Sequence, residues 1–105
     1  MNARERMARN IVVDHDILGW GDEHTKELLE KYESIIQVGK HADLPQRAFD
    51  EKVAAYCNLN QCDLMTGDAK SYTHFFEAGI KSVNVTKYAW WTKGDRPIYL
   101  VKIAE

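Results

Sequence analysis

The chain has 105 residues, 45% of them hydrophobic and 29% charged, and its formal net charge is −2 at pH 7. This length allows one domain with a single hydrophobic core, and the composition excludes a disordered protein. A nearly balanced charge gives no global attraction for nucleic acid, so any such binding depends on local patches. No apolar run reaches the roughly 20 residues of a membrane span, and the first residues lack the apolar segment of a secretory signal. We therefore expect a cytoplasmic protein without a membrane partner, folded as one domain over residues 1–105 with residues 1–9 as a solvated arm.

The apolar pattern predicts alternating strands and helices along the chain. The unbroken β-branched run at 11–13 is typical of a strand that is buried on both faces. The glycines on either side of Trp20 are expected to interrupt the chain, and Asp22 then caps a helix that ends near Tyr32. Further strands are expected at 34–38, 62–66, 81–88 and 98–103, and further helices at 45–59 and 68–79, with a loop at 41–44 and a turn at 93–97.

The order of these elements, β-α-β-α-β-α-β-β, predicts an α/β fold. We expect three layers, α/β/α, in which helices cover both faces of a mostly parallel sheet of about five strands, with an antiparallel strand at one edge. Cys57 and Cys62 do not complete a zinc site, and their apolar neighbours predict reduced core thiols. Asp63 follows Cys62 into the third strand and is expected to point to solvent or a turn.

Several carboxylates are predicted to converge where strands of this sheet end. Asp14 follows the first strand, Asp68 follows the third, and Asp50 lies in the first turns of the helix that precedes the third strand. In an open α/β sheet, ligands bind at this carboxyl edge. The helical period places Asp50 on the same stripe as Val53 and Cys57, so its side chain is expected to face the core.

Carboxylates that meet in this way need either a raised pKa or a cation. Two carboxylates about 4 Å apart repel by roughly 4 kcal/mol at an effective dielectric of 20. Oxygen ligands without a histidine or thiolate cage suit Mg²⁺ or Mn²⁺. We therefore expect Asp14, Asp50 and Asp68 to bind the metal and act in catalysis, with Asp16 as a further ligand. A metal held there would polarise a phosphate and lower the pKa of an attacking water, which is the chemistry of phosphodiester hydrolysis.

Each of these acids also has a purely structural explanation. Asp68 is a preferred residue at a helix N-cap, and Asp14 suits the start of a turn. Asp50 would be favoured near a helix N-terminus by the helix dipole alone. The metal-binding hypothesis therefore depends on whether the carboxylates come together in space.

Other residues near the predicted edge are candidates for substrate binding. Thr66 precedes the Asp68 position, and His15 follows Asp14, although a surface histidine is the alternative for His15. Trp20 either covers a substrate groove or plugs the end of the sheet.

Two adjacent tryptophans mark the segment before the last strand. Trp90 and Trp91 would face opposite sides of a strand, so one is expected to pack in the core. The other would serve as an oligomer contact or as a platform for base stacking. Because an exposed aromatic edge invites pairing, we expect a homodimer.

The acidic segments resemble those of PIN-domain ribonucleases. Residues 50–55, Asp-Glu-Lys-Val-Ala-Ala, are similar to a helix start of the type D-x-x-I-A-A, and residues 64–68, Leu-Met-Thr-Gly-Asp, to a strand that ends in T-x-D. Asp50 and Asp68 lie 18 positions apart, as in that family, and Asp14 after Ile-Val-Val matches its first acid. The resemblance implies a compact PIN-like endoribonuclease that uses Mg²⁺ or Mn²⁺ to cleave RNA, single-stranded RNA in particular. It also implies a family whose members are often dimers and often toxins paired with an antitoxin protein.

Two other functions remain open. The glutamate that the PIN family carries on an early helix has no counterpart with the family's local pattern here, so a degenerate PIN-like scaffold could bind RNA or a protein partner without cutting it. A receiver-like domain that binds phosphate and Mg²⁺ is less favoured, because no aspartate ends the second predicted strand at Gln37 and Val38.

Overall fold

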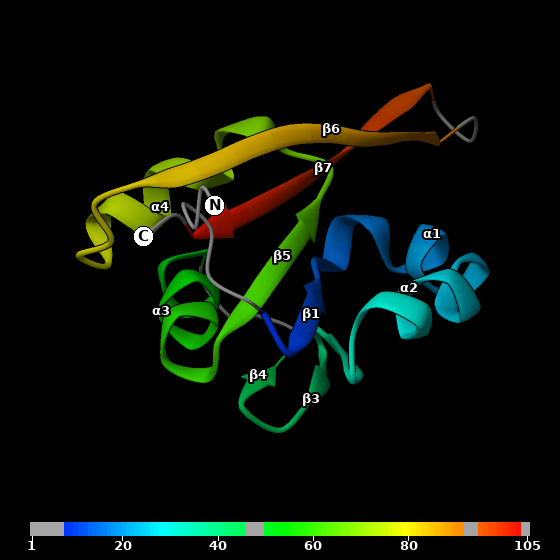
Figure 1. Cartoon of the computed structure of the whole chain (residues 1–105), viewed down its shortest axis with the longest axis horizontal. Coiled ribbons are helices and arrows are strands. Elements are labelled where there is room, and N and C mark those ends of the chain that lie inside the picture. The colour runs from blue at the N-terminus through cyan, green and yellow to red at the C-terminus, as the bar shows by residue number, and fades with distance from the viewer. Residues whose placement is uncertain (1–7, 46–49, 92–94, 104–105) are drawn as a thin grey trace, which may run out of the picture.

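The computed structural model describes residues 8–45, 50–91 and 95–103. Five strands form one sheet in the order β2-β1-β5-β7-β6 (Figure 1). They are β1 (Asn10–Val13), β2 (Ser34–Gln37), β5 (Cys62–Thr66), β6 (Val83–Trp91) and β7 (Arg96–Ile103), and a separate short ladder joins β3 (Lys40–His41) to β4 (Leu44–Pro45). The helices are α1 (Leu18–Glu23), α2 (Thr25–Lys31), α3 (Asp50–Asn60) and α4 (Tyr72–Glu77), and the single 3-10 turns η1 (His15–Ile17) and η2 (Ala69–Ser71) precede α1 and α4.

The sheet is mixed, which confirms the α/β class but not a mostly parallel arrangement. Strand β1 pairs in parallel with both β2 and β5, whereas β7 is antiparallel to β5 and also to β6. After α4 the chain runs to the outer position as β6 and turns back, so that β7 fits between β6 and β5 (Figure 1). The antiparallel strand expected at the edge therefore lies inside the sheet.

Two apolar clusters form on the two faces of the central strands. Neighbouring residues of one strand point to opposite faces, so Val12 joins one cluster and Val13 the other. The Val12 cluster contains residues of α3 and α4, including Phe75, and the Val13 cluster contains residues of α1 and α2, including Trp20 and Leu28. The side chains of Cys57 and Cys62 are buried in the first of these clusters, as predicted.

The segment around Trp20 forms a helix rather than a chain break. Gly19 and Gly21 both lie within α1, and a Cβ added to Gly21 would be only 2.9 Å from Val13 Cγ1. Glycine therefore allows α1 to pack directly onto β1, and the burial of Trp20 offsets the low helix propensity of its neighbours. The helix expected from Asp22 begins earlier and is divided at His24, which lies between α1 and α2.

Several other boundaries differ from the prediction. The strand expected at 81–88 is β6 at Val83–Trp91, the helix expected at 68–79 is divided into η2 and α4, and β7 begins at Arg96, inside the turn expected at 93–97. The expected loop at 41–44 lies within the β3–β4 ladder, and Pro45 belongs to β4 rather than to a helix. The helix expected from Pro45 is described from Asp50 onward, since residues 46–49 lie outside the described residues. Of the expected N-terminal arm, residues 1–7 also lie outside them, whereas Arg9 donates its backbone N–H to Gln61 and pairs with Glu33 at 3.1 Å. None of the helices in the described ranges has the length and apolar character that crossing a membrane requires.

Candidate functional site

Asp14 lies directly beyond β1, at the carboxyl end of the parallel strands. Its backbone N–H donates to the Met65 carbonyl at 2.9 Å, so the pairing of β1 with β5 extends to this residue. The carboxylate accepts two hydrogen bonds, from the His15 backbone N–H at 2.8 Å and from the Thr66 hydroxyl at 2.9 Å. Asp14 is therefore held in one orientation by groups from two elements.

The surroundings of Asp14 disfavour its ionised form. Burial is the main cause that raises the pKa of its carboxyl, and the negative charge of Asp16 raises it further. The charge of Asp50 acts in the same direction, although the hydrogen bonds from Thr66 and His15 lower the pKa in part. The structure thus brings three of the four predicted acids close enough to interact, as an accumulation of negative charge at this edge.

Thr66 connects Asp14 with the fourth acid. Its side chain is buried, and its hydroxyl accepts the backbone N–H of Asp68 at 3.2 Å while it donates to Asp14. The Asp68 carboxylate is exposed and accepts the backbone N–H of Lys70 at 2.9 Å, as an N-cap of η2. We refer to the carboxylates of Asp14, Asp16, Asp50 and Asp68 as the acidic edge.

Asp16 is held by an arginine that sequence reasoning did not identify. Arg96, the first residue of β7, places Nη2 2.9 Å from Asp16 Oδ2 and donates through Nη1 to the Asp16 carbonyl at 3.0 Å. Gly67 lies beneath this pair, because a Cβ at Gly67 would be 2.8 Å from both Arg96 Nη2 and Asp16 Oδ2. The sequence placed Arg96 in a turn, and no local spacing links it to a residue 80 positions earlier.

Asp50 is partly exposed rather than directed into the core. It is the first residue of α3, and 53% of its side chain is exposed, whereas Val53 and Cys57 are buried as predicted. The stripe is therefore buried at Val53 and Cys57 but exposed at Asp50. Asp50 Oδ2 lies 3.3 Å from His74 Nε2, a partner from α4 that the sequence did not reveal.

His74 also belongs to a small group of possible metal ligands. Its Nδ1 is 3.3 Å from Glu77 Oε2, and single ligand atoms of Glu51, His74 and Glu77 all lie within 4.8 Å of one another. Glu51 and Glu77 are both exposed, and Glu51 neighbours Asp50 in α3. These residues could hold a cation beside the acidic edge, but exposed acids of this kind are common on protein surfaces.

The two other candidate substrate contacts are placed differently. His15 is exposed at the start of η1, beside Asp14, where its side chain is accessible. Trp20 is 1% exposed, stacks on His24 with ring centroids 4.3 Å apart and meets Tyr88 edge-on at 5.9 Å. Trp20 is therefore a buried core residue that packs against the rings of His24 and Tyr88.

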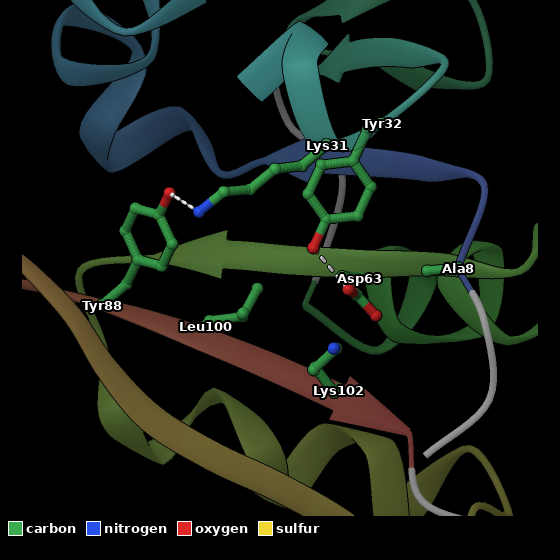
Figure 2. A pocket seen from close by; sticks show the side chains of 7 residues that line it. All are labelled: Ala8, Lys31, Tyr32, Asp63, Tyr88, Leu100 and Lys102. Carbon is green, nitrogen blue, oxygen red and sulfur yellow. Dashed lines mark hydrogen bonds between the residues drawn. The ribbon is translucent and has the colours of Figure 1, made fainter. Parts of the chain in front are cut away.

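A pocket of about 270 Å³ lies away from the acidic edge, on the sheet face that α1 and α2 cover (Figure 2). Its described lining residues are Ala8, Lys31, Tyr32, Asp63, Tyr88, Leu100 and Lys102. Asp63 is 1% exposed and accepts a hydrogen bond from the Tyr32 hydroxyl at 2.5 Å, so the expectation that it points to solvent is wrong. A second hydrogen bond joins two lining residues, with Lys31 Nζ donating to the Tyr88 hydroxyl at 2.8 Å (Figure 2).

Comparison with known proteins does not assign the chain to a class. No protein-family model matches it, and no curated protein or solved structure is significantly similar to it. Any functional conclusion therefore depends on the chemistry of the residues themselves.

Proposed function

We propose that this protein is a compact PIN-like, three-layer α/β/α endoribonuclease that uses Mg²⁺ or Mn²⁺ to hydrolyse phosphodiester bonds in RNA. The observation that carries the proposal is the position of Asp14. Its partly buried carboxyl lies at the carboxyl ends of β1 and β5, and burial together with the charges of Asp16 and Asp50 raises its pKa. Ligands of open α/β sheets bind at this edge, and a carboxylate disfavoured in this way is stabilised by a cation.

The residues at the acidic edge suit a hard divalent cation. Asp14, Asp50 and Asp68 would hold it through carboxylate oxygens, with Asp16 as a further ligand, and oxygen ligands are those that Mg²⁺ and Mn²⁺ prefer. When bound, such a metal polarises the scissile phosphate and activates a water molecule. The Thr66 hydroxyl orients Asp14 by donating to Oδ2, and the exposed His15 is placed to contact a phosphate of the substrate.

Single-stranded RNA is the proposed substrate, since an extended strand can present its phosphates to carboxylates that hold a metal. We further propose that the biological setting is that of a toxin controlled by an antitoxin protein, and that the active form is a homodimer. These partners follow from the likeness of the two acidic segments to those of PIN-domain ribonucleases.

The same residues favour one alternative, a PIN-like scaffold that binds RNA or a protein partner without cutting it. Asp16 is paired with Arg96, Asp50 lies beside His74, and Asp68 caps η2. A metal would have to compete with each of these contacts. If these contacts persist in the presence of metal, the carboxylates of Asp16, Asp50 and Asp68 stay with the protein's own groups and do not bind the ion.

Cleavage of a labelled single-stranded RNA separates the two functions. With Mn²⁺ or Mg²⁺ the unmodified protein should cut the RNA, EDTA should stop the reaction, and Asp14→Asn should lower turnover by orders of magnitude while the protein stays folded. The matched control is Asp43→Asn, which removes an exposed acid from the loop between β3 and β4 and should leave turnover unchanged. Equal cleavage in EDTA, or by Asp14→Asn purified in the same way, would refute the nuclease. RNA binding without cleavage under any metal would instead favour the scaffold.

A further inference from the structure

A row of side chains crosses three strands and begins at the acidic edge. Thr66 of β5 is directly opposite Tyr99 of β7, and Tyr99 is directly opposite Lys87 of β6. Residues directly opposite each other in an antiparallel pair project from the same face of the sheet. Lys87 Nζ then lies 4.9 Å from the centroid of the Trp90 ring. We call Thr66, Tyr99, Lys87 and Trp90 the strip.

The strip continues one face of the hydrophobic core into solvent. The preceding row on the same face, Leu64, Val101 and Val85, belongs to the cluster that α3 and α4 cover. Along the strip itself, exposure increases outward: Thr66 is buried, Tyr99 is partly exposed, and Trp90 is 51% exposed.

A register shift in β6 decides which tryptophan joins the strip. The shift lies between Lys87 and Ala89, so that Tyr88 and Ala89 both pack with the opposite cluster. Trp90 therefore returns to the Lys87 face, opposite Pro97. Trp91 packs on the other face, where its ring is 3.4 Å from the position of a Cβ on Gly19. Of the two tryptophans, Trp90 is the exposed one, and Trp91 is half-buried.

The charge of this region differs from that of the chain as a whole. The chain carries a formal net charge of −2, whereas the strip contains one cation, Lys87, and no carboxylate. Of the other cations in these two strands, Arg96 is paired with Asp16, and Lys102 lines the pocket on the opposite face of the sheet. Lys87 is therefore the group of the strip that attracts a phosphate, while the carboxylates of the acidic edge repel it. Exposed aromatic rings beside cationic groups are the combination that binds unpaired bases, since every base offers a face for stacking.

We propose that the strip binds single-stranded RNA, with one base stacked on Trp90, a phosphate beside Lys87 and a further base against Tyr99. From β5 to β6 the strip spans two strand spacings, roughly 10 Å, which is about three nucleotides at the ~3.4 Å separation of stacked bases. The strand would then run toward Asp14, which accepts a hydrogen bond from the buried Thr66. The delivery of RNA to a cutting centre rests on the proposed function, but the binding itself does not require cleavage.

Binding measured without metal tests the strip separately from the nuclease. The probe is a short fluorescein-labelled single-stranded RNA, followed by anisotropy in EDTA. Trp90→Ala should raise Kd by roughly 5- to 150-fold, the range expected for the loss of one stacked base, and Trp90→Phe should recover most of the affinity. Lys87→Ala should raise Kd and reduce the slope of log Kd against log salt by about one. A duplex of the same sequence should bind more weakly, because its base faces are already stacked.

Two controls make the result specific to the strip. Phe76→Ala removes another exposed aromatic, 45% exposed on α4, and should leave Kd unchanged. Asp14→Asn should bind RNA at least as tightly as the unmodified protein, even though it should not cleave. If the unmodified protein binds RNA in a way that depends on Trp90 but does not cleave it with any metal, the nuclease proposal fails and the strip proposal stands.

Self-association is the outcome that would replace the RNA contact. Light scattering that reports twice the 12.1 kDa chain mass, with Trp90→Ala monomeric and its RNA affinity unchanged, would show that Trp90 contacts a second copy. Both variants should first be shown to be folded by circular dichroism. If Trp90→Ala and Lys87→Ala then bind RNA as tightly as the unmodified protein, the proposal is overturned whatever the oligomeric state.

Discussion

Replacing Gly67 by alanine tests whether the Arg96–Asp16 pair holds the acidic edge in place. Among the described glycines only Gly39 and Gly79 have a positive φ, so an alanine at position 67 meets no backbone strain. It meets a lack of space instead. The new Cβ would lie 2.8 Å from Arg96 Nη2, 2.8 Å from Asp16 Oδ2 and 3.1 Å from Ile17 Cγ2. Because these distances are shorter than van der Waals contact, the arginine, the aspartate and the isoleucine all have to move.

The expected loss of stability follows from what each neighbour can tolerate. The Arg96 and Asp16 side chains are 40% and 23% exposed, so solvent screening limits the ion pair to at most about 1 kcal/mol. Ile17 is fully buried, and forcing it aside costs about 1 kcal/mol, the low end of the range for overpacking. Alanine restricts the unfolded chain and returns roughly 0.4–1 kcal/mol. The free energy of unfolding should therefore fall by about 1–2 kcal/mol, which corresponds to roughly 5–15 °C in Tm.

Urea unfolding of a double-mutant cycle checks this reasoning. Arg96→Ala removes one obstacle, so Gly67→Ala should be less costly in that background, with a coupling of about 0.5–1 kcal/mol. Gly19→Ala is the matched control, because its Cβ would be at an ordinary 3.4 Å from Trp91 within helix α1, and it should be neutral or stabilising. Unchanged stability of Gly67→Ala, or strict additivity with Arg96→Ala, would show that Gly67 does not support the pair.

Two further substitutions test the packing and the charge around β1. Gly21→Ala brings a Cβ to 2.9 Å from Val13 Cγ1 in a buried strand, which should cost about 1–3 kcal/mol, and a gain in helix propensity of up to about 1 kcal/mol offsets part of this. A variant more stable than the unmodified protein in thermal unfolding would contradict the close approach of α1 to β1. The raised pKa of Asp14 means that its carboxyl binds a proton more tightly in the folded state than in the unfolded state. The contribution of Asp14 to stability therefore falls as pH rises from 3.8, the ordinary pKa of the group, through the higher pKa of the folded state. Asp14→Asn should remove that fall, as urea unfolding of both proteins across this pH range would show. Parallel curves of the free energy of unfolding against pH for the two proteins would contradict the prediction.

Local patterns in the sequence were sufficient to predict a strand that is buried on both faces. The strand predicted at 62–66 coincides with β5, because its residues are buried on both faces and their apolar character is visible without knowing what covers them. The pattern could not place β7 between β5 and β6, since alternation along a strand does not specify its partners. It also predicted a break around Trp20, where the burial of that ring outweighs the low helix propensity of two glycines.

The candidate site was predicted through its acids but not through their partners. Convergence was predicted for Asp14, Asp50 and Asp68 from the shared carboxyl edge of the strands, and in the structure the charges of Asp16 and Asp50 both act on Asp14. Arg96 and His74 reach Asp16 and Asp50 from distant parts of the chain, and no spacing rule connects them. The burial of Asp63 could not be predicted either, because the hydroxyl that it accepts from belongs to Tyr32, which lies 31 positions away in the chain.

The inner position of β7 has a consequence for how the protein folds. The residues of β5 are all buried, and the only ladder on its second side is the antiparallel one with β7, described over three residue pairs. Until the β6–β7 hairpin docks, β5 is an apolar strand with an open row of backbone donors and acceptors. Such a row is a template for pairing with another chain, so a partly folded intermediate is more prone to aggregate than the finished sheet. Slow docking of the hairpin during refolding would therefore appear as a loss of yield that grows with protein concentration.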